Sequence, residues 1–200
     1  MSPYEELVAV VHRLHGHGWA SGTGGNFSVA IAGDRLVMTP SGVDKGRVTA
    51  AQLVEIDRDG RVVAGPGAAS AETALHLQIV RSRGAGAVLH VHSVWNTLAS
   101  LRGAAAGVVT IAGLEMLKGL AGVTDHEHRE RVPVIANSQD LAALAAAAAR
   151  VVEAEPGCHG FLIAGHGLYT WGATLAEAER HVEIFEFLFE IVGRQPGAAS

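Results

Sequence analysis

The chain has 200 residues, of which 48% are hydrophobic and 18% are charged, and this composition excludes an intrinsically disordered protein. Its formal net charge is −5 and it has no cluster of basic residues, which argues against nucleic acid as a partner. The single cysteine, Cys158, excludes an internal disulfide and any cysteine-rich zinc motif, and a lone cysteine is typical of a reducing cytoplasm.

No stretch of the sequence predicts export or membrane insertion. The N-terminus has no basic segment ahead of an apolar one, so it does not resemble a secretion signal. The alanine-rich stretch 142–149 is too short to cross a bilayer and is followed by Arg150. We therefore expect a soluble, cytoplasmic protein that forms one domain over residues 1–200.

The first half of the chain predicts two helices and two β-hairpins. Apolar residues recur at helical spacing near the N-terminus, and glycine-containing turns separate pairs of short apolar segments. The predicted elements are a helix over 3–17, hairpin strands over 27–32 and 35–39, a second hairpin over 53–57 and 61–64, and a helix over 70–82. Ser70 would cap that second helix.

The second half of the chain predicts strands that alternate with helices. The predicted elements are strands over 87–92, 108–111, 132–135, 161–164 and 168–171, a helix capped by Ser93, a short helix over 114–120, a helix from Asn137 or Ser138 to about 155, and a helix over 174–192. Residues 193–200 are expected to fray. Hairpins favour antiparallel pairing, and the helices would cover both faces of a sheet. The expected fold class is α/β, a three-layer α/β/α sandwich around a mixed, largely antiparallel sheet.

Two histidines on one predicted strand could bind a metal ion. His90 and His92 are two residues apart, and side chains at this spacing on a strand point to the same face. Two imidazoles can then meet one divalent ion, although two buried, hydrogen-bonded histidines are the commoner explanation of such a pair. A second pair, His126 and His128, lies among charged residues, and we interpret it as a solvated loop.

A third histidine strengthens the hypothesis of a metal site. His166 lies between Gly165 and Gly167 at a predicted strand turn, where glycine permits positive φ and close backbone approach. A histidine on such a turn is suited to reach into a site. Three histidines would leave a coordination position open for water or substrate, as catalytic zinc requires, although they also suit iron, cobalt or nickel. Sequence spacing alone does not bring His166 to the pair.

Two loops rich in glycine and hydroxyl groups could bind an anion. Residues 23–28 and 39–45 offer backbone N–H groups, and Lys45 would add a positive charge. Ser70, at a helix N-terminus, is a further anion contact. Neither loop has the sequence of a P-loop or of a dinucleotide-binding turn, and ordinary hairpin turns explain them equally well. Together they suggest a small phosphorylated substrate.

Five motifs occur in an order that resembles the class II aldolases of the fuculose-phosphate aldolase and adducin-head superfamily. They are Gly24-Gly-Asn-Phe-Ser28, Thr39-Pro-Ser-Gly42, Ser70-Ala-Glu72, His90-Val-His92 and Gly165-His-Gly167, within about residues 5–192. Inside this superfamily the chain most resembles the family of methylthioribulose-1-phosphate dehydratases. That finer resemblance is carried by the segments 113–119 and 160–172 above all.

The resemblance implies a role for each matching residue. It implies zinc ligands at His90, His92 and His166, a general acid/base at Glu115, a metal-site carboxylate at Glu72, and a phosphate pocket formed by Asn26, Ser41, Gly42 and Ser70. The role of Glu72 stays open, because some of these dehydratases carry a cysteine there. The resemblance also implies one Zn²⁺ per subunit and a homotetramer with sites near subunit interfaces.

The implied reaction needs a base with a pKa near the working pH. From position alone Glu115 is a solvated residue paired with Lys118, but the resemblance leads us to expect a partly buried Glu115 with a raised pKa. It would take the C3 proton of 5-methylthioribulose 1-phosphate. Loss of the C4 hydroxyl as water would then give 5-methylthio-2,3-dioxopentyl 1-phosphate, a step of methionine salvage.

Two alternatives belong to the same resemblance. A class II sugar-phosphate aldolase or 4-epimerase would use the same metal but would deprotonate the C4 hydroxyl and break the C3–C4 bond. A non-catalytic binding module, as in the adducin heads, would need no metal at all. Product analysis separates the first alternative from the dehydratase, and metal analysis separates the second.

Overall fold

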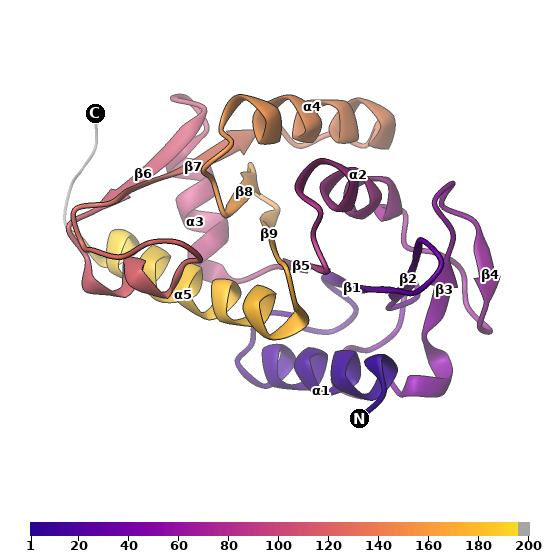
Figure 1. Ribbon diagram of the computed structural model, residues 1–200. Helices are drawn as coiled ribbons and strands as arrows, with labels where there is room; N and C mark the ends of the chain where they lie inside the picture. Colours follow the sequence, from indigo (N-terminus) through magenta and orange to yellow (C-terminus); the bar gives the residue numbers. More distant parts are fainter. Residues whose placement is uncertain (196–200) are drawn as a thin grey trace.

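The computed structural model describes residues 1–195, in which nine strands form one mixed sheet with helices on both faces (Figure 1). The strand order across the sheet is β4-β3-β2-β1-β5-β9-β8-β7-β6. The strands are β1 (Asn26–Ile31), β2 (Arg35–Met38), β3 (Val54–Ile56), β4 (Val62–Ala64), β5 (Ala87–Val91), β6 (Val108–Ala112), β7 (Arg129–Ile135), β8 (Gly160–Ile163) and β9 (Gly167–Gly172). Neighbouring strands are antiparallel except β7 and β8, which are parallel, so the predicted fold class is confirmed.

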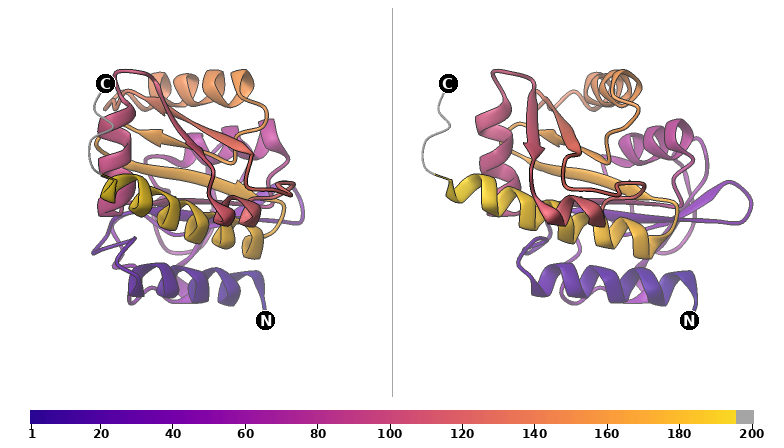
Figure 2. Two further views of the ribbon diagram at one scale, coloured as in Figure 1. Left: turned by 90° about the vertical axis from the view of Figure 1, so that its left-hand side faces the viewer. Right: turned by 60° about the vertical axis from the view of Figure 1, so that its left-hand side comes forward.

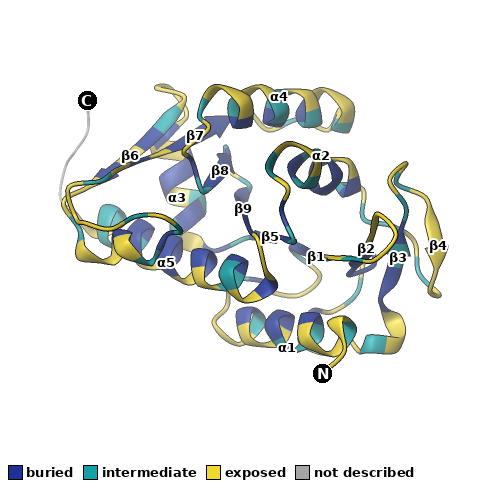
Figure 3. Cartoon of the chain, viewed as in Figure 1, coloured by how far each residue is buried: buried dark blue, intermediate teal, exposed yellow. Residues whose placement is uncertain are grey.

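Five α-helices form the two outer layers (Figure 2). Helices α2 (Thr73–Arg83) and α4 (Leu141–Ala154) pack against each other and against one face of the sheet. Helices α1 (Pro3–Gly16), α3 (Val94–Gly103) and α5 (Leu175–Arg194) pack on the opposite face. Two short 3₁₀ helices, η1 (Ala50–Gln52) and η2 (Glu115–Gly119), lie between strands. Figure 3 shows the buried side of each α-helix turned toward the sheet.

The middle of the sheet is covered on both faces. Every residue of β5, β8 and β9 is buried, and these segments are short apolar runs without alternation of polar side chains. Such runs are typical of strands covered on both faces. Strand β5 therefore holds its side chains in a rigid, dry position, which matters because His90 is one of them.

Most predicted elements are confirmed, and the differences lie at their ends. Helix α2 begins at Thr73 rather than at Ser70, whose side-chain oxygen accepts from the Glu72 N–H in a turn ahead of the helix. Asp140 caps α4 in place of Asn137 or Ser138, because its carboxylate accepts from the Ala143 N–H.

The last helix is longer than predicted. Helix α5 begins at its expected cap, Thr174, but continues to Arg194, so the prediction of fraying is wrong for residues 193–194. Gln195 follows the helix as its C-cap, and residues 196–200 of the predicted tail lie outside the described residues. Within residues 1–195, no helix combines the length and apolar character that a membrane crossing requires.

Candidate metal centre and adjoining cavity

His90 and His92 come to the centre from the end of β5. His90 is fully buried, and its backbone pairs with Asn26 of β1 and Tyr169 of β9. His92 lies one residue past the end of the strand, where its N–H donates to the Trp19 carbonyl at 2.8 Å. The two side chains keep the common direction that the strand periodicity predicts.

His166 reaches the pair from the turn between β8 and β9. Gly165 adopts φ +64°, and the His166 N–H donates to the Ile163 carbonyl at 3.0 Å, which closes the turn. A Cβ at Gly167 would collide with the Val91 carbonyl oxygen and would lie 2.9 Å from the His92 ring. Glycine on this side of the turn therefore lets β9 approach β5 closely enough for the imidazoles to meet.

The three imidazoles converge through their Nε2 atoms. The Nε2 atoms of His90 and His92 are 2.7 Å apart, and those of His90 and His166 are 3.3 Å apart. His90 donates its Nδ1–H to the Leu168 carbonyl at 2.9 Å, so its Nε2 carries a free lone pair. The structure thus brings together the three histidines, of which the sequence spacing placed only His90 and His92 side by side.

Glu72 adds a carboxylate to this cluster. Its Oε2 lies 3.5 Å from the His90 Nε2 atom, and its Oε1 lies 3.6 Å from the His166 Nε2 atom. Asn26 donates its Nδ2–H to Glu72 Oε2 at 2.6 Å, and the Oδ1 of Asn26 accepts from the His76 Nε2–H. A buried hydrogen-bonded chain therefore fixes the carboxylate. His76 was not a predicted site residue, and its helical position gave no signal.

The electrostatics of the cluster fit a bound cation. Burial lowers the pKa of His90 well below its ordinary value, and the neighbouring His92 and His166 lower it further. Burial, followed by His166 and Lys45, lowers the pKa of His92 to about 4. Both shifts favour the neutral form of His90 and His92, which is the form of histidine that binds a metal ion. Three imidazoles and one carboxylate are a donor set that suits zinc and its neighbours.

A cavity of about 320 Å³ opens beside the cluster. Four of the residues that the resemblance implied line it: Asn26, Ser41, Gly42 and Ser70. Lys45 also lines it, although the Nζ atom donates to the carbonyls of Thr23 and Val43, and burial lowers the pKa of the amine. The segment 137–139 completes the wall, and its polar residues were interpreted from the sequence only as a helix cap.

Glu115 does not lie at this cavity within its own chain. Its side chain is 70% exposed, and Lys118 donates to Glu115 Oε1 at 2.6 Å. The hydrogen bond and charge of Lys118 lower the pKa of Glu115. The expectation of a partly buried Glu115 with a raised pKa is therefore wrong for the single chain, because η2 turns this residue toward solvent and toward the ammonium group of Lys118.

Comparisons with known proteins identify the relatives of this chain. The family profile "Class II Aldolase and Adducin N-terminal domain" matches residues 5–192. The chain is 42% identical to a methylthioribulose-1-phosphate dehydratase of Sorangium cellulosum (92% of this chain, 88% of the relative) and 43% identical to one of Xanthomonas euvesicatoria (91% and 84%). The crystal structure of L-fuculose-1-phosphate aldolase from Thermus thermophilus superposes with a TM-score of 0.74 at 29% identity, covering 94% of this chain and 92% of that one.

Proposed function

Because this chain belongs to the class II aldolase and adducin N-terminal domain family, we propose that it is a zinc-dependent methylthioribulose-1-phosphate dehydratase. It would convert 5-methylthioribulose 1-phosphate to 5-methylthio-2,3-dioxopentyl 1-phosphate in cytoplasmic methionine salvage. The observation that carries the proposal is the 42–43% identity to dehydratases of that name over nine-tenths of the chain. The convergence of three histidines and Glu72 on a polar cavity supports it.

His90, His92 and His166 would hold one Zn²⁺ per chain through their Nε2 atoms. When bound, the ion supplies Lewis-acid polarisation of the substrate carbonyl and stabilises the negative charge left by proton removal. Replacing His166 with alanine should abolish zinc binding at this cluster by removing a ligand. Full zinc occupancy in that variant would contradict the assignment of the third ligand.

The cavity beside the histidines is suited to a phosphorylated substrate. Ser41, Gly42 and Ser70 offer hydroxyl and backbone donors, and Gly42 adopts φ +73°, a conformation that few other residues tolerate. Lys45 contributes positive charge from the buried side. The side-chain amide of Asn26 is engaged with Glu72 and His76. We therefore assign Asn26 mainly to the orientation of Glu72.

Glu115 would act at the metal site of a neighbouring subunit. Helix α3 starts directly after the metal-site segment and exposes an apolar face in the single chain, with Val94 70% and Leu101 56% exposed. Met116, next to Glu115, is also exposed. Exposed apolar surface of this kind marks a subunit contact, and we propose a homotetramer in which two such surfaces meet.

In that arrangement Glu115 begins the proton transfers. Glu115 takes the proton from C3 of the ketose phosphate, and burial at the subunit contact would raise its pKa toward neutrality. The C4 hydroxyl leaves as water with a proton from Glu115 or another acid. The resulting enol becomes the 2,3-diketone. Asn26 holds Glu72 beside the histidines.

Product analysis tests the reaction directly. Incubation with 5-methylthioribulose 1-phosphate should give the diketone. An aldehyde and a shorter phosphate would support the aldolase, which is the second candidate because the fold is similar to that of L-fuculose-1-phosphate aldolase. A sugar phosphate with inverted configuration at C4 would support the epimerase. A protein that neither binds zinc nor turns over the substrate would be a binding module.

Glu115→Gln tests the base. The variant should keep its zinc but lose turnover by about 10²–10⁴-fold, the contribution typical of a positioned acid–base group. Glu127→Gln is the matched control, an exposed glutamate on the same connection between β6 and β7, and should retain activity. Near-normal turnover of Glu115→Gln would move the assignment to Glu72.

Subunit mixing tests the shared site. Glu115→Gln and His166→Ala are each expected to be inactive alone. Co-expressed in one tetramer, they should recover about a quarter of the wild-type sites, since an intact histidine cluster then meets an intact Glu115 from its neighbour. No recovery in mixed tetramers would contradict the intersubunit position of Glu115.

A further inference from the structure

A second cluster of metal-binding side chains lies outside the site described above. His128 and Glu130 are two residues apart at the start of β7, and His159 directly precedes β8. The Oε2 atom of Glu130 lies 2.8 Å from His128 Nε2 and 3.0 Å from His159 Nδ1. These separations match the 2.7 and 3.3 Å between imidazole nitrogens of the first cluster. We propose that His128, Glu130 and His159 form a second binding site for a zinc-like divalent cation.

The surroundings of the cluster orient its ligand atoms. His159 Nε2 is 2.8 Å from the Ala121 carbonyl, which fixes the ring so that Nδ1 faces Glu130. The backbone N–H of His159 donates to the other carboxylate oxygen, Oε1, at 3.0 Å. Hydrogen bonds of this kind from outside the ligand set orient metal-binding histidines and carboxylates. Two histidines and a glutamate are also an established zinc donor set.

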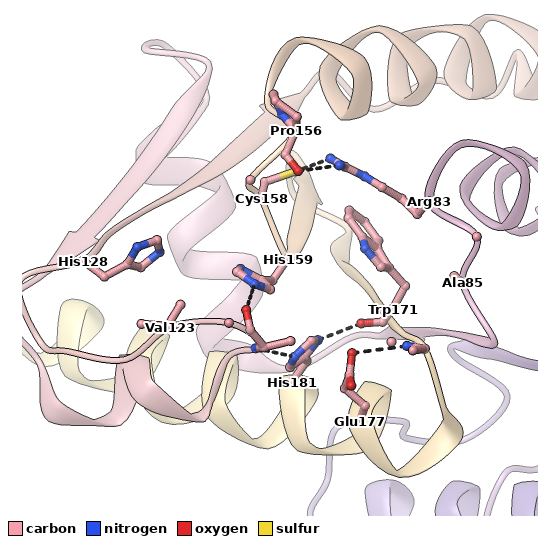
Figure 4. A pocket seen from close by; sticks show the side chains of 16 residues that line it. Arg83, Ala85, Val123, His128, Pro156, Cys158, His159, Trp171, Glu177 and His181 are labelled. Carbon is pink, nitrogen blue, oxygen red and sulfur yellow. Dashed lines mark hydrogen bonds between the residues drawn. The ribbon is translucent and has the colours of Figure 1, made fainter.

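Burial and access at the cluster suit a cation. Glu130 is 1% exposed, and a buried carboxylate needs a positive partner. His128 and His159 line a cavity of about 450 Å³, so an ion between them would keep open positions toward this space (Figure 4). The cavity shares no lining residue with the one beside His90, so the two sites are separate.

Cation binding would replace a proton. The proton between His159 Nδ1 and the Glu130 carboxylate would leave to solvent as the ion takes its place. His128, which also donates to Glu130, would carry its hydrogen on Nδ1 once its Nε2 binds the ion. The bound ion would then cross-link the beginnings of β7 and β8, whose parallel pairing begins only further along, at Val134 and Leu162.

Zinc titration of the metal-free protein tests the proposal. Calorimetry should show about two equivalents of Zn²⁺ per chain, one of them lost in His128→Ala and the other in His166→Ala. His126→Ala is the matched control, because His126 belongs to the same His-Glu-His run but is exposed outside the cluster, and it should keep both equivalents. Zinc should stabilise His128→Ala against heat less than it stabilises the wild type, and an unchanged circular dichroism spectrum of the variant would exclude misfolding as the cause.

A ligand swap gives an independent readout. His128→Cys keeps a metal-binding group, so Co²⁺ added to this variant should produce a thiolate-to-cobalt absorption that is absent from the wild type and its Cys158. Two results would overturn the proposal. One is a wild-type protein whose only equivalent is lost in His166→Ala. The other is a second equivalent that persists in His128→Ala.

Discussion

Glu186 is a buried acid whose proton should control the stability of the fold. It lies on α5 with 2% exposure, accepts from the Ser93 hydroxyl, and accepts from Asn96 Nδ2 at 2.8 Å. Burial raises the pKa of Glu186 to about 7, and the hydrogen bonds from Ser93 and Asn96 offset only part of this effect. The folded protein therefore holds a proton on Glu186 over a pH range in which the unfolded chain has released it.

The size and sign of the effect follow from this difference. The pKa rises from 4.5 to about 7, which corresponds to about 3 kcal/mol at 1.36 kcal/mol per unit. A raised carboxyl pKa means that the folded state binds more protons, so stability falls as the pH rises from 4.5 to 7 and levels off above. Glu186→Gln retains the shape of the protonated acid without the charge. It should therefore be about 3 kcal/mol more stable than the wild type at pH 8.

Urea unfolding at several pH values and one protein concentration measures this difference. Comparing variant and wild type at each pH cancels the contribution of the histidines. The gain should shrink toward zero as the pH falls to 4.5. Glu183→Gln is the control, because Glu183 is an exposed glutamate on the same helix, where a substitution should change stability by about 0.5 kcal/mol or less. A Glu186→Gln protein that gains no stability at pH 8, or gains the same amount at every pH, would refute the argument.

Three further substitutions test the packing and orientation of the site and the fold. Asn26→Ala should lower zinc affinity by about 10–100-fold in a chelator competition, because Glu72 loses its donor, and unchanged affinity would contradict that role. Gly167→Ala should lower the free energy of unfolding by about 1–3 kcal/mol in urea and weaken zinc binding, because the added methyl group collides with the Val91 carbonyl. Wild-type values of both would show that β9 can move aside. Thr174→Ala removes the cap that accepts from the first turn of α5 and should cost about 1 kcal/mol, whereas no loss would mean that the cap is redundant.

Local patterns in the sequence determined most of the elements. The 3.6-residue period predicted α1, the capping signal at Thr174 predicted the start of α5, and strand alternation predicted that His90 and His92 share a face. The glycines on either side of His166 likewise predicted a turn, and Gly165 adopts the positive φ that such a turn requires. These features depend on residues a few positions apart, so a linear sequence contains them in full.

Only the tertiary structure decided which distant groups meet. The approach of β9 to β5 brought His166 to the histidine pair, and the packing of α2 on β1 brought Glu72 to Asn26. Glu115 was the opposite case, since η2 turned it to solvent in the single chain. His128 paired with Glu130 and His159 rather than acting with His126, because β7 and β8 lie side by side. Such contacts arise from strand order and layer packing, which the spacing of residues along the chain does not encode.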